Sequence, residues 1–152
     1  MRISKRMAQV QPLPVAPGEH AENIGGPKVT IEPGFQDILQ HAVDFVNKTY
    51  PDLLKDVTDV YGHVDKGGIF GEYKSESPHS VYVDVRNIEA EVKRQMPGAS
   101  EGEIKSQIGQ QIVKTLIHEA SHKKEFTQTG HTSEAGPEAA EKAVEPLLRQ
   151  MQ

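Results

Sequence analysis

Hydrophobic residues recur every three or four positions along several stretches of this chain, and this spacing predicts helices. The first stretch, 35–50, stops at Pro51, because the residue before a proline disfavours helical conformation. A second and shorter stretch, 88–96, stops at a proline–glycine pair. Both patterns indicate amphipathic helices with one face on a core.

The third predicted helix is the best specified. Ser100 and Glu103 form the Ser-x-x-Glu pattern of a capping box, in which each side chain bonds the backbone amide of the other residue. A fourth helix is expected from Pro137, and Pro146 should kink or split it. Between these two helices we expect a polar loop over about 123–136. Along the third helix, apolar residues repeat every fourth position at Ile104, Ile108, Ile112, Leu116 and Ala120.

Three further stretches predict strands. Residues 80–85 alternate strictly, with valines on one face, which is typical of a half-buried strand near a sheet edge. Residues 57–64 and 69–74 are also strand candidates, and the glycine-containing stretch 65–68 between them predicts a turn, as in a hairpin.

Proline and glycine interrupt residues 1–34, so we interpret this segment as an irregular arm, with a short strand at 29–32. The remaining residues, 35–152, are long enough to fold as one domain. One hypothesis is that the arm acts as a pro-segment of that domain.

Charge and composition exclude several functions. The 152 residues include 17 Lys plus Arg and 22 Asp plus Glu, a formal net charge of -5, so we expect no nucleic-acid partner, which usually requires a basic surface. There is no cysteine, so a transition metal must be held by His, Asp or Glu. The apolar runs are far shorter than the ~20 residues that cross a bilayer, and the N-terminus lacks a secretory signal. We therefore expect no membrane segment, which is compatible with a cytoplasmic location.

The third helix contains His118-Glu119-Ala120-Ser121-His122, an HExxH motif. Four residues advance a helix by ~400°, so the two imidazoles lie one turn apart and can reach one metal ion. Without cysteine, the donors favour Zn²⁺ held by histidine and carboxylate. Zinc lowers the pKa of a bound water to ~7, and Glu119, beside the first ligand, would accept that proton as the catalytic base.

With a later glutamate, the motif resembles the gluzincin metallopeptidases. In that clan HExxH is followed, about 18 residues later, by a glutamate on a separate helix, and often by an acidic residue four positions further on. Here 18 residues lie between His122 and Glu141, and Glu145 follows. The short chain also resembles the minigluzincins, minimal scaffolds of the clan. The resemblance implies that Glu141 is the third zinc ligand, after His118 and His122. It also implies that Glu145 hydrogen-bonds a ligand imidazole.

The resemblance also implies an α+β fold: a small zincin-like domain with a backing helix, a short, mostly antiparallel sheet, an active-site helix and a glutamate helix. The strand 80–85 would be the edge strand of the sheet, and would bind an extended peptide by main-chain hydrogen bonds. A tyrosine or histidine would stabilise the oxyanion. The candidates are Tyr82 and His131, together with Tyr73 and His79.

The residues themselves leave the third ligand open. Glu138, with 15 residues between it and the motif, and His131 are alternatives to Glu141. Glu134 is a further candidate. A histidine ligand in that loop would resemble the SprT-type zincins, whereas the metzincin pattern is excluded because its glycine and third histidine are missing.

Three functions follow from these patterns. The first is a zinc-dependent metallopeptidase, an endopeptidase by default, that hydrolyses peptide bonds of a peptide or protein substrate. The second is a catalytically inactive zinc-binding module for peptide interaction or assembly, in which a fourth protein ligand excludes water. The third is an interaction domain without metal. Zinc content and peptide cleavage distinguish them.

Overall fold

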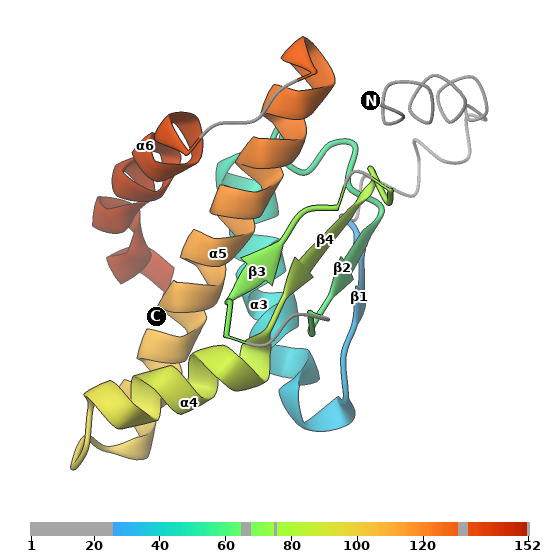
Figure 1. Ribbon diagram of the computed structural model, residues 1–152. Coiled ribbons are helices and arrows are strands. Elements are labelled where there is room, and N and C mark those ends of the chain that lie inside the picture. The colour runs from blue at the N-terminus through green and yellow to red at the C-terminus, as the bar shows by residue number, and fades with distance from the viewer. Residues whose placement is uncertain (1–25, 65–67, 75, 131–133, 152) are drawn as a thin grey trace.

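The computed structural model describes residues 26–64, 68–74, 76–130 and 134–151. This part of the chain forms an α+β fold with four α-helices and one small mixed sheet (Figure 1). The helices are α3 (Gln36–Thr49), α4 (Val85–Gln95), α5 (Glu101–Thr129) and α6 (Ala135–Val144). The strands are β1 (Lys28–Thr30), β2 (Asp59–Tyr61), β3 (Gly71–Glu72) and β4 (Ser80–Val83), and two 3₁₀ segments are η1 (Pro33–Phe35) and η2 (Glu145–Met151).

The sheet has the strand order β1-β2-β4-β3. The β1–β2 and β2–β4 pairs are parallel, and β3 runs antiparallel to β4. Our expectation of a mostly antiparallel sheet is therefore wrong. Helix α3 connects β1 to β2, and parallel neighbours require a crossover connection of this kind. The short strand expected at 29–32 is present as β1, which begins one residue earlier and ends two residues earlier.

Two expectations about strand neighbours are also wrong. The strands within 57–64 and 69–74 do not form a hairpin, because β4 lies between β2 and β3. The strand within 80–85 is interior, and in the described part of the chain β1 and β3 form the two edges of the sheet. Alternation of hydrophobic and polar residues indicates that one face of a strand is buried, but it does not indicate how many strands pair with it. Residues 65–67 of the expected turn lie outside the described residues.

The predicted helices over 35–50 and 88–96 are confirmed as α3 and α4. Helix α4 begins earlier than expected, at Val85, because the Asp84 side chain accepts a hydrogen bond from the Asn87 amide and caps the helix. Val85 continues the alternating pattern of β4 in the sequence, but it is the first residue of α4 in the structure.

The capping box at the start of α5 is confirmed. Ser100 Oγ accepts a hydrogen bond from the Glu103 amide at 3.1 Å, and Glu103 Oε1 accepts one from the Ser100 amide at 3.0 Å. These two bonds satisfy amides that have no partner within the helix.

The far end of α5 differs from the prediction. The helix continues to Thr129, so residues 123–129 of the expected loop are helical. Buried Lys123 and Phe126 extend the buried stripe of the helix beyond the motif. Gly130 then ends the helix with a φ of 78°, a conformation that glycine adopts at little cost. Pro146 divides the last helix as expected, since α6 is followed by the 3₁₀ segment η2.

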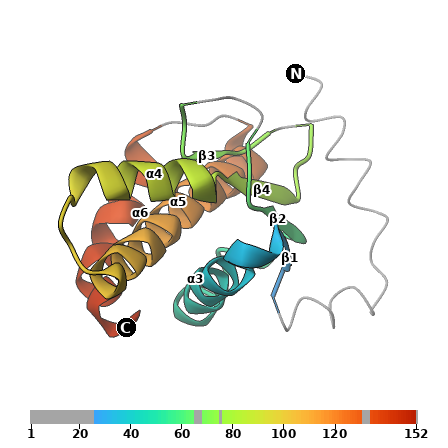
Figure 2. The same cartoon turned by 90° about the horizontal axis from the view of Figure 1, so that it is seen from below.

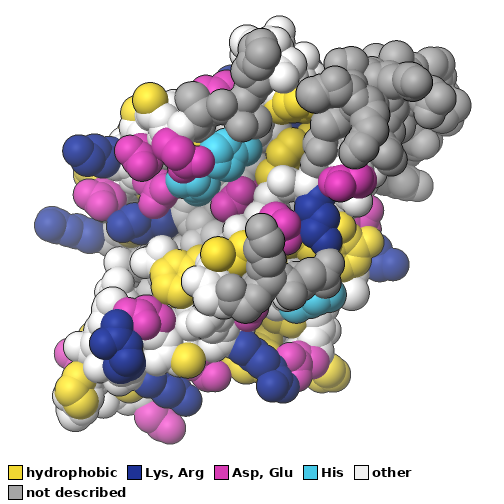
Figure 3. Space-filling model, viewed as in Figure 1, with side chains coloured by type: hydrophobic (Ala, Val, Ile, Leu, Met, Phe, Trp, Pro, Cys, Tyr) yellow, Lys and Arg dark blue, Asp and Glu magenta, His cyan; other side chains and the backbone are white. Residues whose placement is uncertain are grey.

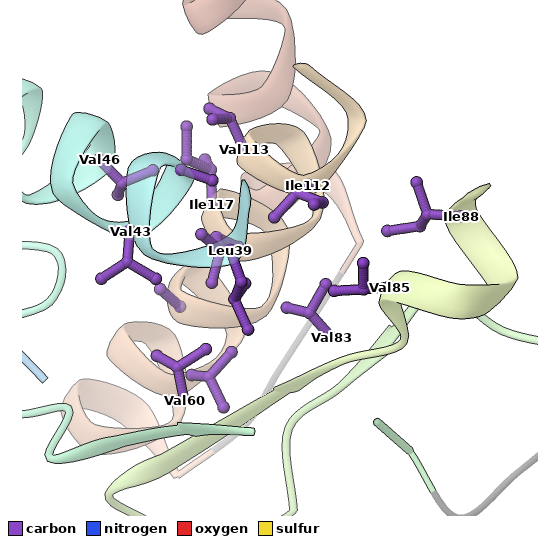
Figure 4. Packing of buried hydrophobic residues seen from close by; sticks show 14 of the residues in the cluster. Leu39, Val43, Val46, Val60, Val83, Val85, Ile88, Ile112, Val113 and Ile117 are labelled. Atoms are coloured by element: carbon purple, nitrogen blue, oxygen red, sulfur yellow. The ribbon is translucent and has the colours of Figure 1, made fainter. Parts of the chain in front are cut away.

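The hydrophobic core fixes the position of α5. This helix contacts α3, α4, α6, β3 and β4, and the helices gather on one side of the sheet (Figure 2). Side chains of α3, α5 and the sheet converge in the core (Figure 4). They include Leu39, Val43, Val46, Val60, Val83, Ile112 and Ile117, each no more than 1% exposed. Among the described residues, no helix combines the length and apolar character needed to cross a bilayer.

Candidate metal centre

The two histidines of the motif lie one turn apart on α5. Their Nε2 atoms are 3.2 Å apart, and the ring planes meet at 74°. Both side chains are mostly buried, with exposed fractions of 19% for His118 and 13% for His122. The helical spacing of four residues therefore directs two imidazole nitrogens to one point, as the sequence predicted.

The carboxylate that meets these nitrogens belongs to Glu134, the residue before α6. Its Oε1 lies 3.0 Å from His118 Nε2, and its Oε2 lies 3.2 Å from His122 Nε2. Glu134 is brought there because it immediately precedes α6, which packs against α5. The ligand atoms of these three residues all lie within 4.8 Å of one another. We call this group the His-His-Glu cluster.

Glu141, which the resemblance implies to be the third ligand, lies on the other side of the His118 ring. Its Oε2 contacts Nδ1 of His118, and it does not belong to the cluster. A proton on Nδ1 donated to this carboxylate leaves the lone pair of Nε2 free for a metal. Glu141 thus occupies the orienting position that the resemblance implies for Glu145.

The other acidic candidates lie outside the cluster. Glu145 Oε2 contacts Lys114 Nζ at 3.2 Å, one turn before the motif, and so joins the end of α6 to α5 through a partly exposed ion pair. Glu138 is exposed in the first turn of α6 and is not a member of the cluster. His131 lies outside the described residues.

The tyrosines and the histidine considered for the oxyanion make other contacts. Tyr82 stacks on Tyr61 of the neighbouring strand, with ring centroids 5.2 Å apart. Tyr73 packs against Phe126, and burial raises its pKa to about 12. His79 contacts a backbone carbonyl through Nδ1. The structure therefore does not bring these side chains into the His-His-Glu cluster.

Glu119 follows the first histidine and is 8% exposed. Burial raises the pKa of its carboxyl to about 7, since the charges of Glu134, Glu72 and Glu141 add to the burial effect and that of His118 opposes it. A carboxyl group with a pKa near neutrality can both accept and donate a proton under physiological conditions. This is the protonation behaviour that a general base in hydrolysis needs.

The two imidazoles have different protonation equilibria. Burial by itself lowers the pKa of His118, but the hydrogen bond with Glu141 and the charges of nearby glutamates raise it above its ordinary value. Burial lowers the pKa of His122, and the charge of Glu134 only partly opposes this. The difference arises because Glu141 contacts one ring and not the other.

The donor set fits a zinc ion. A tetrahedral ion with bonds of ~2.0–2.1 Å has neighbouring ligand atoms ~3.3 Å apart. The two Nε2 atoms are 3.2 Å apart, and each lies 3.0–3.2 Å from a different oxygen of Glu134. Two buried side-chain atoms among the described residues lack a hydrogen-bond partner, His122 Nδ1 and Glu72 Oε1. The unpaired atom of His122 is Nδ1, whereas its Nε2 faces the cluster, and the charge of Glu72 acts on Glu119.

The surface around the cluster is acidic. Figure 3 shows histidine side chains surrounded by acidic ones, with basic side chains further out. The sequence left Glu134 as one of several candidates for the third ligand, beside Glu141, Glu138 and His131. The one signal in the sequence is its position between the glycine that ends α5 and the alanine-rich start of α6.

Comparison of the chain with protein-family models, curated proteins and solved structures gives no match. The interpretation of the site therefore depends on its own geometry.

Proposed function

We propose that this chain is a zinc-dependent metallopeptidase. The observation that carries the proposal is the convergence of two imidazole nitrogens and the Glu134 carboxylate within 4.8 Å, with buried Glu119 adjoining the first histidine. Two histidines and one glutamate are a ligand set of catalytic zinc in peptidases.

Each residue of the site has a defined part in the proposed hydrolysis. His118, His122 and Glu134 would hold the ion, which supplies Lewis acidity for the peptide carbonyl and for water. Glu119 accepts a proton from the water whose oxygen attacks the carbonyl carbon. It then delivers that proton to the amine nitrogen as the carbon–nitrogen bond breaks. Glu141 holds Nδ1 of His118 and so keeps Nε2 directed at the cluster.

The edge strand β3 is placed to align a substrate. Among the strands of the described residues it pairs with β4 alone, and it packs against α5 close to Glu119, as the position of Gly71 demonstrates. An extended peptide can add to such an edge by main-chain hydrogen bonds. In this proposal β3 takes the substrate-binding role that the sequence suggested for the strand 80–85.

The decisive experiment compares the wild-type chain with Glu119→Gln. The glutamine variant keeps the side-chain volume but cannot accept the proton, so we expect kcat for a quenched fluorescent peptide library to fall at least ~100-fold. Zinc content, measured by elemental analysis, should stay at the wild-type level because Glu119 is not a ligand. Glu138→Gln, an exposed change on α6, is the matched control and should keep wild-type activity.

Two results would contradict the proposal. One is a zinc-loaded wild-type chain that cleaves no peptide in the library, which favours the inactive zinc-binding module. The other is unchanged cleavage by Glu119→Gln, which would mean that the base is assigned to the wrong residue or that the cleavage comes from a contaminant.

A further inference from the structure

Gly71 of the edge strand lies directly over one turn of α5. A methyl group at this position would stand 2.5 Å from Cγ2 of Thr115, 3.0 Å from Cγ of Glu119 and 3.0 Å from the backbone oxygen of Tyr82. Thr115 and Glu119 are four residues apart and share one face of the helix. The close approach of β3 to α5 is therefore possible only because residue 71 has no side chain.

Two of these three neighbours cannot move aside easily. The Thr115 hydroxyl donates a hydrogen bond to the Gln111 carbonyl at 2.9 Å, which fixes the rotamer that points the methyl group at β3. The Tyr82 oxygen is part of the backbone of β4, which pairs on both sides. Among these neighbours, the flexible one is the Glu119 side chain, so a methyl group at position 71 must displace either Glu119 or β3.

We infer that Gly71 is a positioning residue for the proposed catalytic base: the lack of a side chain at 71 determines where the Glu119 carboxylate stands relative to the His-His-Glu cluster. The inference rests on the proposed function. Gly71 is not among the glycines with positive φ, so alanine fits the backbone conformation there. Its effect would come from the contacts with Thr115, Glu119 and the backbone oxygen of Tyr82.

The test uses Gly71→Ala, the double variant Gly71→Ala/Thr115→Ser, and Gly102→Ala as the matched control. Serine removes the methyl group at 2.5 Å but keeps the hydroxyl, so the double variant relieves the contact with Thr115 and retains the contact with Glu119. Gly102 lies near the start of the same helix, and a methyl group there has no heavy atom within 4 Å.

We expect Gly71→Ala to lower kcat by ~10–100-fold, the usual result of misplacing a catalytic group by about 1 Å. Zinc affinity should change little, because the cluster is untouched. The double variant should recover thermal stability but not kcat, and Gly102→Ala should keep the wild-type kcat.

A second measurement does not depend on catalysis. The side-chain carboxyl carbon of Glu119, assigned in the zinc-free protein with the glutamine variant, should change its ¹³C chemical shift in Gly71→Ala and in the double variant. The inference is overturned if that signal stays in place, or if the double variant regains kcat together with stability. If the zinc-loaded wild type cleaves no peptide, the proposed function fails, and the carboxyl signal alone decides whether Gly71 positions Glu119.

Discussion

At the scale of single residues, the candidate site depends on which glutamate meets the imidazole nitrogens. Glu134 faces Nε2 of both histidines, whereas Glu141 contacts Nδ1 of His118 from behind. Removal of a ligand should cost more metal-binding free energy than removal of an orienting carboxylate, because the orienting group acts on the metal only through the ligand. The two glutamates can therefore be distinguished by their effects on zinc affinity.

We predict that Glu141→Gln weakens zinc binding ~10–100-fold, as loss of a carboxylate behind a ligand histidine commonly does. Glu134→Gln should weaken it further, because it removes a charged donor from the ion itself. Zinc affinity is measured by competition with a chromophoric chelator, and Glu138→Gln serves as the control. A larger loss from Glu141→Gln than from Glu134→Gln would instead assign Glu141 as the third ligand, as the gluzincin resemblance implies.

At the scale of elements, the motif lies on α5, a helix that begins with a capping box and ends at Gly130. Its middle is held by core contacts with α3 and the sheet, and the motif lies beyond the middle, where α6 packs. The capping box lies about four turns before the motif, so it contributes to the stability of the helix without touching the site.

We predict that Ser100→Ala lowers the free energy of unfolding by ~1 kcal/mol, because the Glu103 amide loses its acceptor. Urea denaturation of the zinc-free chain measures this change. Gln107→Ala, on an exposed position of the same helix, should change stability by less than about 0.5 kcal/mol. Equal effects of the two substitutions would show that the cap contributes no more than an ordinary surface residue.

At the scale of the whole molecule, the cluster joins two helices that meet only through tertiary packing. His118 and His122 come from α5, and Glu134 precedes α6. An ion bound to all three would stabilise the folded state, because the unfolded chain does not hold these donors together.

We predict that zinc at 100 times its Kd adds ~2.7 kcal/mol to the free energy of unfolding. For a chain of this size that corresponds to a rise in Tm of about 5–10 °C, measured by differential scanning calorimetry and reversed by a chelator. His118→Ala/His122→Ala should show no rise. Magnesium is a second control, since it prefers oxygen donors. If zinc raised the Tm of the double variant equally, the stabilising zinc would be bound at another site.

The elements and the motif could be predicted from the sequence, whereas the sheet could not. Helical periodicity predicted α3, the capping box predicted the start of α5, and Pro146 predicted the break after α6, because these signals act within a few residues. The alternation at 80–85 predicted a strand but gave no neighbours for it. Strand order depends on the crossover through α3, which no local pattern encodes.

The sequence by itself determined that two imidazoles meet at one point with a glutamate beside them, because a helix of 3.6 residues per turn brings positions 118 and 122 onto one face. Only the tertiary structure decided which distant carboxylate joins them. That choice depends on where α5 ends at Gly130 and on how α6 packs back against it. A spacing counted along the chain carries no such information, since a turn can bring residue 134 to the ligand nitrogens and send residue 141 to the opposite side of the ring.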